Sequence, residues 1–305
     1  MQIYYEGVDI TRDAEIVAAT VRESAGEQAD ALEVTMQNPS QWNRWQPKRG
    51  ERVEAVRGDY TTGTMYVDTL MPDNGKYRLL ASSMTAEAGR RRWQSYEQCT
   101  LKDIVASVAA ETGMEYGVFG IDERTEYPYM LRQNETAVGF LSRILRMEGA
   151  ILKCTFGRLS VVGIEYAQSL AVTREIRLTS ETPGVKHRRA EGMAYAACEI
   201  ISPYGHGNAV DVAVENGITL TLADEPVYND IQAARWARGA LLWENRKAET
   251  LTFQTDFDAS LTAMTPVVIT GGESYDGYWM TDAVEHDLYN GSTRCGLMRF
   301  VETVR

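Results

Sequence analysis

The spacing of apolar residues changes twice along this chain, and that change limits the folds that the chain can adopt. Leu32, Val34 and Met36 alternate with polar residues, which is the period of a β-strand with one buried face. After Thr100 the apolar residues recur every three or four positions, as on one face of a helix. Strand-like alternation returns at about residue 166. The sequence therefore predicts a β region, an α/β region and a second β region.

The first region, residues 1–85, contains several short strand patterns. Arg52–Val56, Gly63–Leu70 and Tyr77–Ala81 have the composition of strands. Pro72–Gly75 lies between the last two and predicts a hairpin, because Asn and Gly tolerate a positive φ. Short antiparallel strands at this spacing predict a small β-barrel or sandwich.

The middle region, residues 86–165, is predicted to be a small α/β module of two helices and a hairpin. Thr100 and Asp103 have the spacing of a capping box at the start of the first helix. The second helix is predicted over about 135–148. The alternating residues 151–162 then predict a tight hairpin.

The last region, residues 166–305, is predicted to be a second antiparallel β-barrel that carries one packed helix, at about 230–246. Leu251 and Phe253 belong to one of its alternating strand patterns. Trp236 lies on the apolar face of the helix and is interpreted as a core or subunit-interface residue. The predicted fold class is therefore mainly β with α+β character.

Charge and cysteine content disfavour several classes of protein. The chain has 31 Lys and Arg residues and 43 Asp and Glu residues, a net charge of −12, so general nucleic-acid binding is not expected. The basic runs Arg90–Arg92 and Lys186–Arg189 are interpreted as solvated loops or subunit contacts. The four cysteines have neither zinc-site spacing nor the pattern of a disulfide framework. They are expected to be reduced core residues: Cys99, Cys154, Cys198 and Cys295.

Membrane insertion is also not expected. No apolar stretch approaches the roughly 20 residues that cross a bilayer. The acidic N-terminal segment does not have the pattern of a signal peptide. The expectation is a soluble protein made in the cytoplasm.

No catalytic, cofactor-binding or metal site is predicted, because the sequence contains no HExxH, GxSxG, phosphate-loop or GxGxxG motif. His187 lies in a basic segment, His206 lies between two glycines, and His286 lies in the last long strand pattern. A catalytic triad is spatial rather than sequential, so a triad stays open as a disfavoured alternative.

Acidic and aromatic residues leave two further alternatives. Asp122, Glu123 and Glu181 could be hydrolytic carboxylates, since glycosidases use two at a set separation, but a solvated surface is favoured. Trp42 and Trp45 lie in a polar segment and could bind a sugar or a partner. The favoured interpretation is that these two side chains close the end of a barrel.

Four segments, in order along the chain, carry a resemblance to a known family: Gln28–Thr35, Lys48–Val53 with Thr62–Asp68, Glu135–Ala150 with Arg158–Val161, and Gly277–Leu288. They resemble the opening strand, the following strand pair, the middle helix with its hairpin, and the closing strand of the phage late control protein D family. This family comprises the baseplate hubs of contractile tails and the hub portion of type VI secretion spike proteins. The resemblance covers nearly the whole chain and is weakest between about 166 and 215.

The resemblance implies a non-enzymatic structural protein with two tail-tube-like β-barrel domains and no cofactor. Such hubs are homotrimers that join the sixfold tail tube to the threefold spike, which fits a cyclic ring. The implied partners are the tail tube protein, the central spike protein, the tape-measure protein and other baseplate proteins. The implied location is the tail baseplate of a virion or tailocin, assembled in the host cytoplasm. The spike is expected to be a separate protein, and the acidic charge is expected to keep the lumen from binding DNA.

Two other functions stay open at this point. One is a tail-associated cell-wall hydrolase. The other is a tail protein that binds host glycans, with Trp42, Trp45 and Trp279 as stacking platforms.

Overall fold

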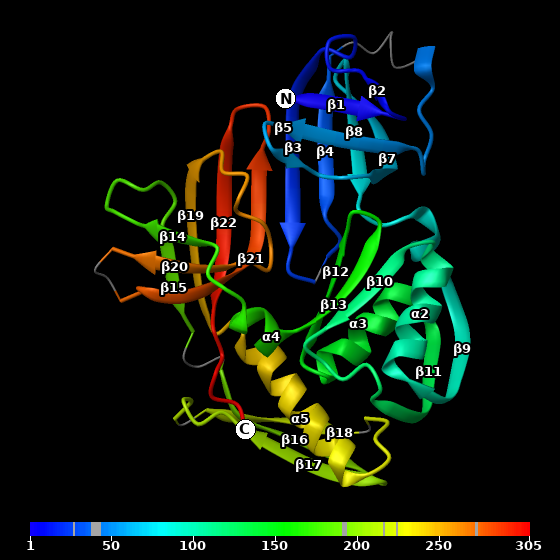
Figure 1. Cartoon of the computed structure of the whole chain (residues 1–305), viewed down its shortest axis with the longest axis vertical. Helices are drawn as coiled ribbons and strands as arrows, with labels where there is room; N and C mark the ends of the chain where they lie inside the picture. Colours follow the sequence, from blue (N-terminus) through cyan, green and yellow to red (C-terminus); the bar gives the residue numbers. More distant parts are fainter. Residues whose placement is uncertain (27, 38–43, 191–193, 216, 224, 272–273) are drawn as a thin grey trace.

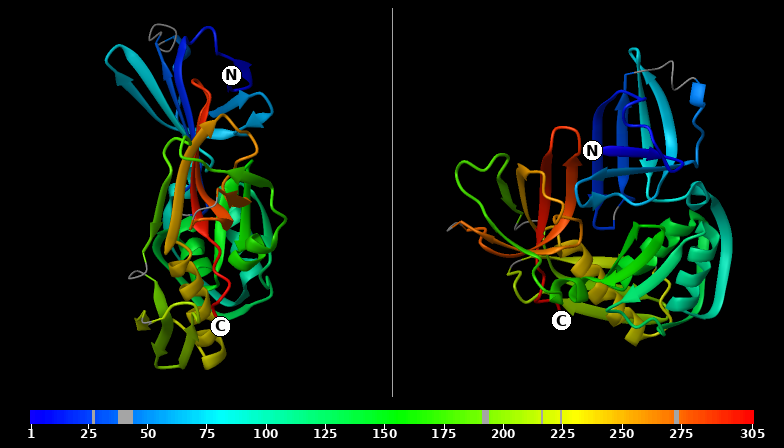
Figure 2. Two further views of the ribbon diagram at one scale, coloured as in Figure 1. Left: turned by 90° about the vertical axis from the view of Figure 1, so that its left-hand side faces the viewer. Right: turned by 45° about the horizontal axis from the view of Figure 1, so that its top comes forward.

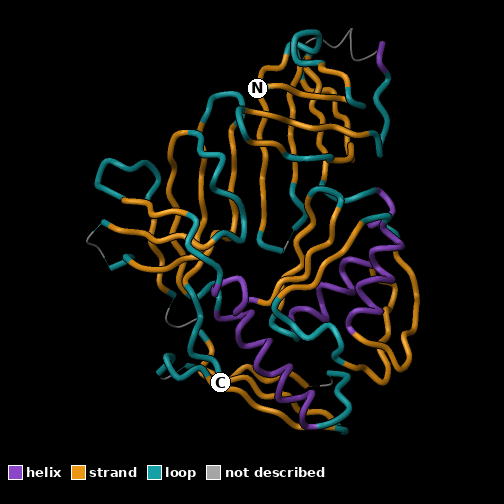
Figure 3. Tube along the Cα trace, viewed as in Figure 1, coloured by secondary structure: helices purple, strands orange, loops and turns teal. Residues whose placement is uncertain are grey.

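The structure is a computed structural model that describes residues 1–26, 28–37, 44–190, 194–215, 217–223, 225–271 and 274–305. Strands dominate it, and the longer helices lie in one half of the molecule (Figures 1 and 3). The N-terminus lies in the large sheet. The C-terminus lies at the opposite end, beside the three-stranded sheet β17–β16–β18 (Figure 1). In the described residues no helix is both long and apolar enough to cross a membrane.

The N-terminal region contributes eight strands to a large sheet. They are β1 (Gln2–Tyr5), β2 (Val8–Asp9), β3 (Ile16–Ser24), β4 (Ala31–Met36), β5 (Arg52–Arg57), β6 (Tyr60–Thr61), β7 (Met65–Asp73) and β8 (Lys76–Ser82). As predicted, Leu32, Val34 and Met36 are buried and face a common core. The expected hairpin is β7–β8, with Asn74 and Gly75 at positive φ.

Strands from the C-terminal region continue the same sheet. They are β14 (Arg174–Arg177), β15 (Lys186–Arg189), β19 (Glu249–Asp256), β20 (Pro266–Thr270), β21 (Gly277–Asp287) and β22 (Ser292–Arg299). Their core contains Leu251, Phe253 and Trp279.

The two sets of strands meet where β3 pairs with β21, a contact that we call the β3–β21 seam. The pairing is antiparallel, with Val21 opposite His286 and Glu23 opposite Val284. The strand order runs from β15 through the seam to β2, so the described strands form no closed barrel. The expected mainly β fold is confirmed, but the strands expected in two β-barrel domains form one continuous open sheet. Pairing across the seam satisfies backbone groups that two separate open sheets would expose.

The middle region forms the predicted α/β module. Its elements are η1 (Ala86–Gly89), β9 (Arg91–Thr100), α2 (Leu101–Thr112), β10 (Glu115–Phe119), β11 (Glu126–Thr136), α3 (Ala137–Met147), β12 (Ala150–Thr155), β13 (Arg158–Gly163) and α4 (Ile164–Ser169). The capping box of Thr100 and Asp103 is present, and Gly113 ends α2 in the left-handed conformation. The predicted hairpin is β12–β13.

The remaining elements extend this module rather than the large sheet. They are β16 (Tyr195–Ser202), β17 (Gly205–Val210), β18 (Ile218–Ala223) and α5 (Asp230–Asn245). The prediction that the helix packs on the second barrel is wrong, since Trp236 lies in one core with residues of α2 and α3. The reason is a close approach of two backbones: a Cβ on Gly239 would lie 2.1 Å from the carbonyl oxygen of Met147.

The β12–β13 hairpin points from the module toward the large sheet (Figures 1 and 2). Close contacts at two glycines dock it there. A Cβ on Gly26 would lie 2.2 Å from Cγ2 of Ile151, and a Cβ on Gly63 would lie 2.3 Å from the Phe156 ring. Both glycines have positive φ, a conformation that other residues rarely adopt.

Candidate functional site

His286 has contacts on both ring nitrogens and on the ring itself, but its side chain is fully buried. Its Nδ1 lies 2.9 Å from Oγ1 of Thr293 and its Nε2 lies 3.0 Å from the carbonyl oxygen of Leu261. The ring packs against Tyr60 and Phe257. Burial lowers the pKa of His286, so the neutral form is favoured. With both nitrogens engaged and no exposed surface, this histidine is a core residue without access to a substrate.

The other two histidines pair with glutamates at separate places. Nε2 of His187, on β15, lies 3.0 Å from Oε1 of Glu249. Nε2 of His206, on β17, lies 2.9 Å from Oε1 of Glu199. Neither pair includes a serine, cysteine or threonine nucleophile, so neither of these two histidines belongs to the arrangement that a catalytic triad requires.

The three candidate carboxylates lie in two loops that belong to different parts of the fold. Asp122 and Glu123 are in the turn before β11, where Glu123 accepts a hydrogen bond of 2.9 Å from Lys102. Glu181 is in the loop between β14 and β15, in the large sheet. The structure therefore does not assemble them into a pair flanking a bond.

Neither described tryptophan that was a candidate stacking platform, Trp45 or Trp279, is exposed, whereas Trp93 on β9 is 70% exposed. Trp279 is fully buried and its Nε1 donates to the carbonyl oxygen of Tyr275 at 2.8 Å, so its proposed role as a platform is wrong. Trp45 is half-buried and packs against the N-terminal core. Trp42 lies outside the described residues. Trp236 is buried, as interpreted from its helical position.

The cysteines are free and buried, as predicted. Burial raises the pKa of the Cys154, Cys198 and Cys295 thiols to about 12. A thiol of this kind is protonated at neutral pH and is a poor nucleophile.

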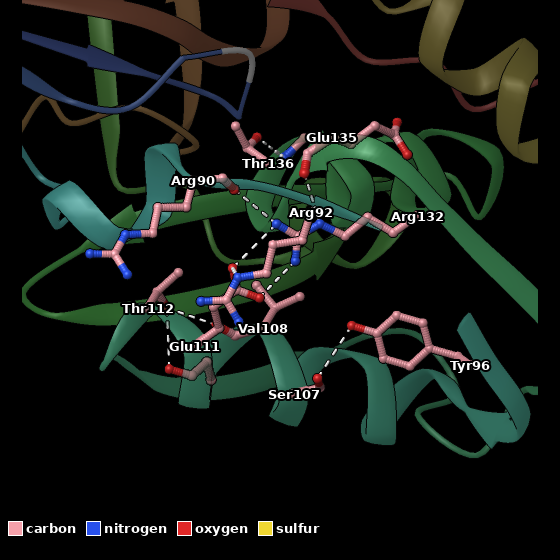
Figure 4. Close-up of polar contacts among 12 residues, drawn as sticks. Arg90, Arg92, Tyr96, Ser107, Val108, Glu111, Thr112, Arg132, Glu135 and Thr136 are labelled. Carbon is pink, nitrogen blue, oxygen red and sulfur yellow. Dashed lines mark hydrogen bonds and ion pairs between the residues drawn. The ribbon is translucent and has the colours of Figure 1, made fainter. Parts of the chain in front are cut away.

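The first basic run surrounds a buried arginine from another strand (Figure 4). Arg132, on β11, is inaccessible to solvent and donates to the Glu111 carboxylate at 2.7 Å. It also donates to the carbonyl oxygens of Arg90 and Glu135. Arg92 lies 3.5 Å from the same Glu111 carboxylate. This network ties β9, α2 and β11 together, which is a structural role.

A second buried carboxylate, Glu148, joins the module to α5. Its oxygens accept hydrogen bonds from Tyr127 Oη, Arg235 Nε, Arg235 Nη2 and Trp236 Nε1 at 2.6–3.1 Å. Two segments distant in sequence, β11 and α5, are thereby fixed to the end of α3.

A third polar cluster lies where the hairpin meets the large sheet. Nζ of Lys153 contacts both oxygens of Asp30, at 2.5 and 2.7 Å, and Tyr60 donates to Glu23 at 2.8 Å. These residues line a cavity of about 330 Å³ between β3, β6, the hairpin and residues 259–263. Burial raises the pKa of Asp30 to about 6, an effect that Lys153 opposes.

Sequence reasoning singled out Arg90–Arg92 and Trp236 but did not predict that they belong to polar clusters, and it did not identify Glu111, Glu148, Asp30 or Lys153. The available signal was a charged residue inside a predicted apolar element, as with Lys153 between apolar strand residues. In the described part of the chain, no three His, Cys, Asp or Glu side chains gather as a metal site would require.

The edges of the large sheet are the other features that bear on function. One end of the main strand order is β2, with two residues, and the other is β15, which carries the second basic run, Lys186–Arg189; β14 forms a further edge beside β20. Short edge strands and basic side chains both hinder uncontrolled strand pairing. In the described residues, polar clusters thus hold the module and the large sheet together, and the edge strands of the large sheet are short or basic, which disfavours non-specific strand pairing.

Comparison with protein-family models and with curated proteins finds no match. Solved structures do match over almost the whole chain. The chain is similar to the 43 kDa tail protein of prophage MuSo2 from Shewanella oneidensis, with a TM-score of 0.77 and 14% identity over 100% of this chain and 99% of that one. A tail protein from Neisseria meningitidis MC58 gives a TM-score of 0.77 and 12% identity, covering 98% of this chain and 95% of that one.

A third similar structure is a component of the Escherichia coli type VI secretion system, which is itself described as similar to tail proteins of bacteriophage T4. Its TM-score is 0.62 at 11% identity, over 99% of this chain and 78% of that one. The chain therefore has the fold of phage tail proteins, in agreement with the resemblance found in its sequence.

Proposed function

We propose that this protein is a non-enzymatic hub of the baseplate of a contractile injection particle, such as a phage tail or a tailocin. In this role three copies form a ring that joins the sixfold tail tube to the threefold central spike. Its partners in the particle are the tube protein, the spike, the tape-measure protein and other baseplate proteins.

The observation that carries the proposal is the β3–β21 seam. Through it one chain contributes two neighbouring units of strands to a single sheet. Three copies related by a threefold axis would present six such units to a tube and three equivalent surfaces to a spike. The end-to-end similarity to phage tail proteins supports the same role.

The exposed face of the sheet near the seam supports a passage that does not retain DNA. Arg22 pairs with Glu285 across the seam at 2.7 Å, and Glu33 pairs with Arg22 and Arg78. Arg22 and Arg78 on this face are thus occupied by carboxylates, which lowers their affinity for phosphates. The net charge of −12 acts in the same direction.

The test is native mass spectrometry of the purified chain, alone and then co-expressed with the products of the neighbouring reading frames. We expect a complex containing three copies of the chain once a trimeric partner is present, even if the isolated chain is a monomer. A ring whose contacts are individually weak forms only when a partner stabilises it. A chain that stays monomeric with every neighbour would overturn the proposal.

Two charge variants test whether the edge strand β15 forms the contact between copies of the chain. Lys186→Glu together with Arg188→Glu reverses charge on the exposed edge strand β15, and we expect it to reduce the fraction of trimer. Arg124→Glu changes an exposed residue of the β10–β11 loop and serves as the control. Equal trimer fractions in both proteins would exclude β15 from the contact between copies.

A further inference from the structure

Exposed apolar side chains gather around the three-stranded sheet β17–β16–β18. The described residues contain 16 large apolar side chains that are exposed, and six of these lie within residues 201–231. These six are Ile201, Tyr204, Val210, Val212, Ile218 and Ile231. Single exposed apolar residues are ordinary, but such a group is typical of an interaction surface.

The edge strand β18 is the most open element of this sheet. It pairs on one side with β16, in parallel, and on its other side no described strand pairs with it. All of its side chains are exposed or half-buried, and Ile218 is 63% exposed. Its sequence, Ile-Thr-Leu-Thr-Leu-Ala, has high β propensity and lacks the charges and prolines that usually protect an edge.

Two other edges in the same half of the molecule are covered. On β17, Val210 exchanges two backbone hydrogen bonds with Arg305, at 2.9 and 3.0 Å. On β11, Arg143 donates to the carbonyl oxygen of Leu131 at 3.0 Å, and Tyr228 donates to that of Tyr129. No described side chain bonds to the backbone of β18 in this way, so its edge is available for a further strand.

We propose that β18 binds an extended segment of a different protein, which adds to the sheet as a fourth strand. The segment has an uncharged, β-branched centre that covers Ile218 and Leu220, and Lys or Arg residues at its ends. The basic ends complement Glu215 and Glu225, which flank the uncharged strand. Glu215 is exposed and makes no ion pair with a described residue, while Glu225 lies in the field of Arg143 and Arg146. This inference does not depend on the hub role.

Charge also argues against a second copy of this chain as the occupant. Antiparallel pairing of two β18 strands would bring Glu215 of one copy toward Glu225 of the other. Parallel pairing would bring identical glutamates together. Like charges that face each other across a strand pair are destabilising, so both arrangements are disfavoured.

The test uses a fluorescein-labelled peptide, Lys-Lys-Thr-Val-Thr-Ile-Thr-Val-Lys-Lys, and the full chain, with binding followed by fluorescence anisotropy. We expect saturable binding that weakens at least about tenfold when alternate peptide nitrogens are methylated, because strand addition depends on main-chain hydrogen bonds. Replacing the four lysines by glutamates should weaken it by a similar factor, about tenfold. Hydrogen exchange should slow at residues 218–223.

Two matched variants of the chain test whether the peptide binds beside β18. Glu215→Gln should lower the affinity for the lysine-flanked peptide by about threefold, since it removes one exposed charge next to the strand. Glu181→Gln makes the same change in the distant β14–β15 loop and should leave the affinity unchanged. Absence of binding, equal binding of the N-methylated peptide, or slowed exchange elsewhere than at 218–223 would each overturn the proposal.

Discussion

Nε1 of Trp236 donates a hydrogen bond of 2.6 Å to Oε1 of Glu148, and this contact fixes α5 to the end of α3. Both side chains are almost fully buried. The same carboxylate also accepts hydrogen bonds from Tyr127 and Arg235, so one acidic group satisfies donors from two separate segments, β11 and α5. The module and the β16–β18 sheet are joined through it into one unit.

Replacing this carboxylate should therefore destabilise the protein strongly. Glu148→Gln leaves one acceptor oxygen for the four hydrogen bonds and leaves Arg235 without a counter-charge. We expect the free energy of unfolding, measured by urea denaturation, to fall by about 3 kcal/mol or more. Glu165→Gln removes an exposed ion pair between Glu165 on α4 and Arg238 on α5, and it should lower the free energy of unfolding by less than about 1 kcal/mol. Equal losses would show that Glu148 does not fix α5.

The docking of the hairpin can be tested at Gly26. A Cβ at this position would lie 2.2 Å from Cγ2 of Ile151 and 3.1 Å from the carbonyl oxygen of Leu152, both on β12. Gly58 also has a positive φ but has open space around its Cβ position. Gly58→Ala should cost about 1–2 kcal/mol from backbone strain alone. Gly26→Ala should cost about 1–3 kcal/mol more from overpacking, as measured by thermal or urea unfolding.

Local features of the fold were predictable from sequence because their causes are local. Thr100 and Asp103 form the predicted capping box, and Leu32 and Val34 face the core as their alternation predicts. The burial of the cysteines follows from their apolar character and spacing.

Long-range contacts were not predictable in this way. The seam pairs Val21 with His286, and nothing in either strand pattern specifies a partner so distant in the chain. The position of α5 depends on the contact of Gly239 with Gly149, which an apolar helix face does not encode. The pairing of Lys153 with Asp30 is likewise set only by the docked hairpin.

The burial of His286 should make stability depend on pH. Its pKa is lowered in the folded state, so below the ordinary value of about 6.5 the unfolded chain binds more protons. Stability should therefore fall as the pH drops through 6.5. In His286→Gln this component disappears, although the variant is less stable at every pH. The measurement is the difference between the unfolding free energies of the two proteins from pH 5 to pH 8, which should shrink toward low pH. A constant difference would show that His286 titrates normally.

Asp30 should contribute a pH dependence of the opposite sign. Burial raises its pKa from 3.8 to about 6 despite Lys153, so between these values the folded protein binds more protons than the unfolded chain. Stability relative to Asp30→Asn should therefore decline as the pH rises from 4 to 6, by at most about 3 kcal/mol. Lys153→Met removes the cation that opposes the shift, so the decline should extend to higher pH. The check is a series of urea unfolding curves for the three proteins. A difference between wild type and Asp30→Asn that does not change with pH would mean that water reaches Asp30 and that the hairpin is not closely docked.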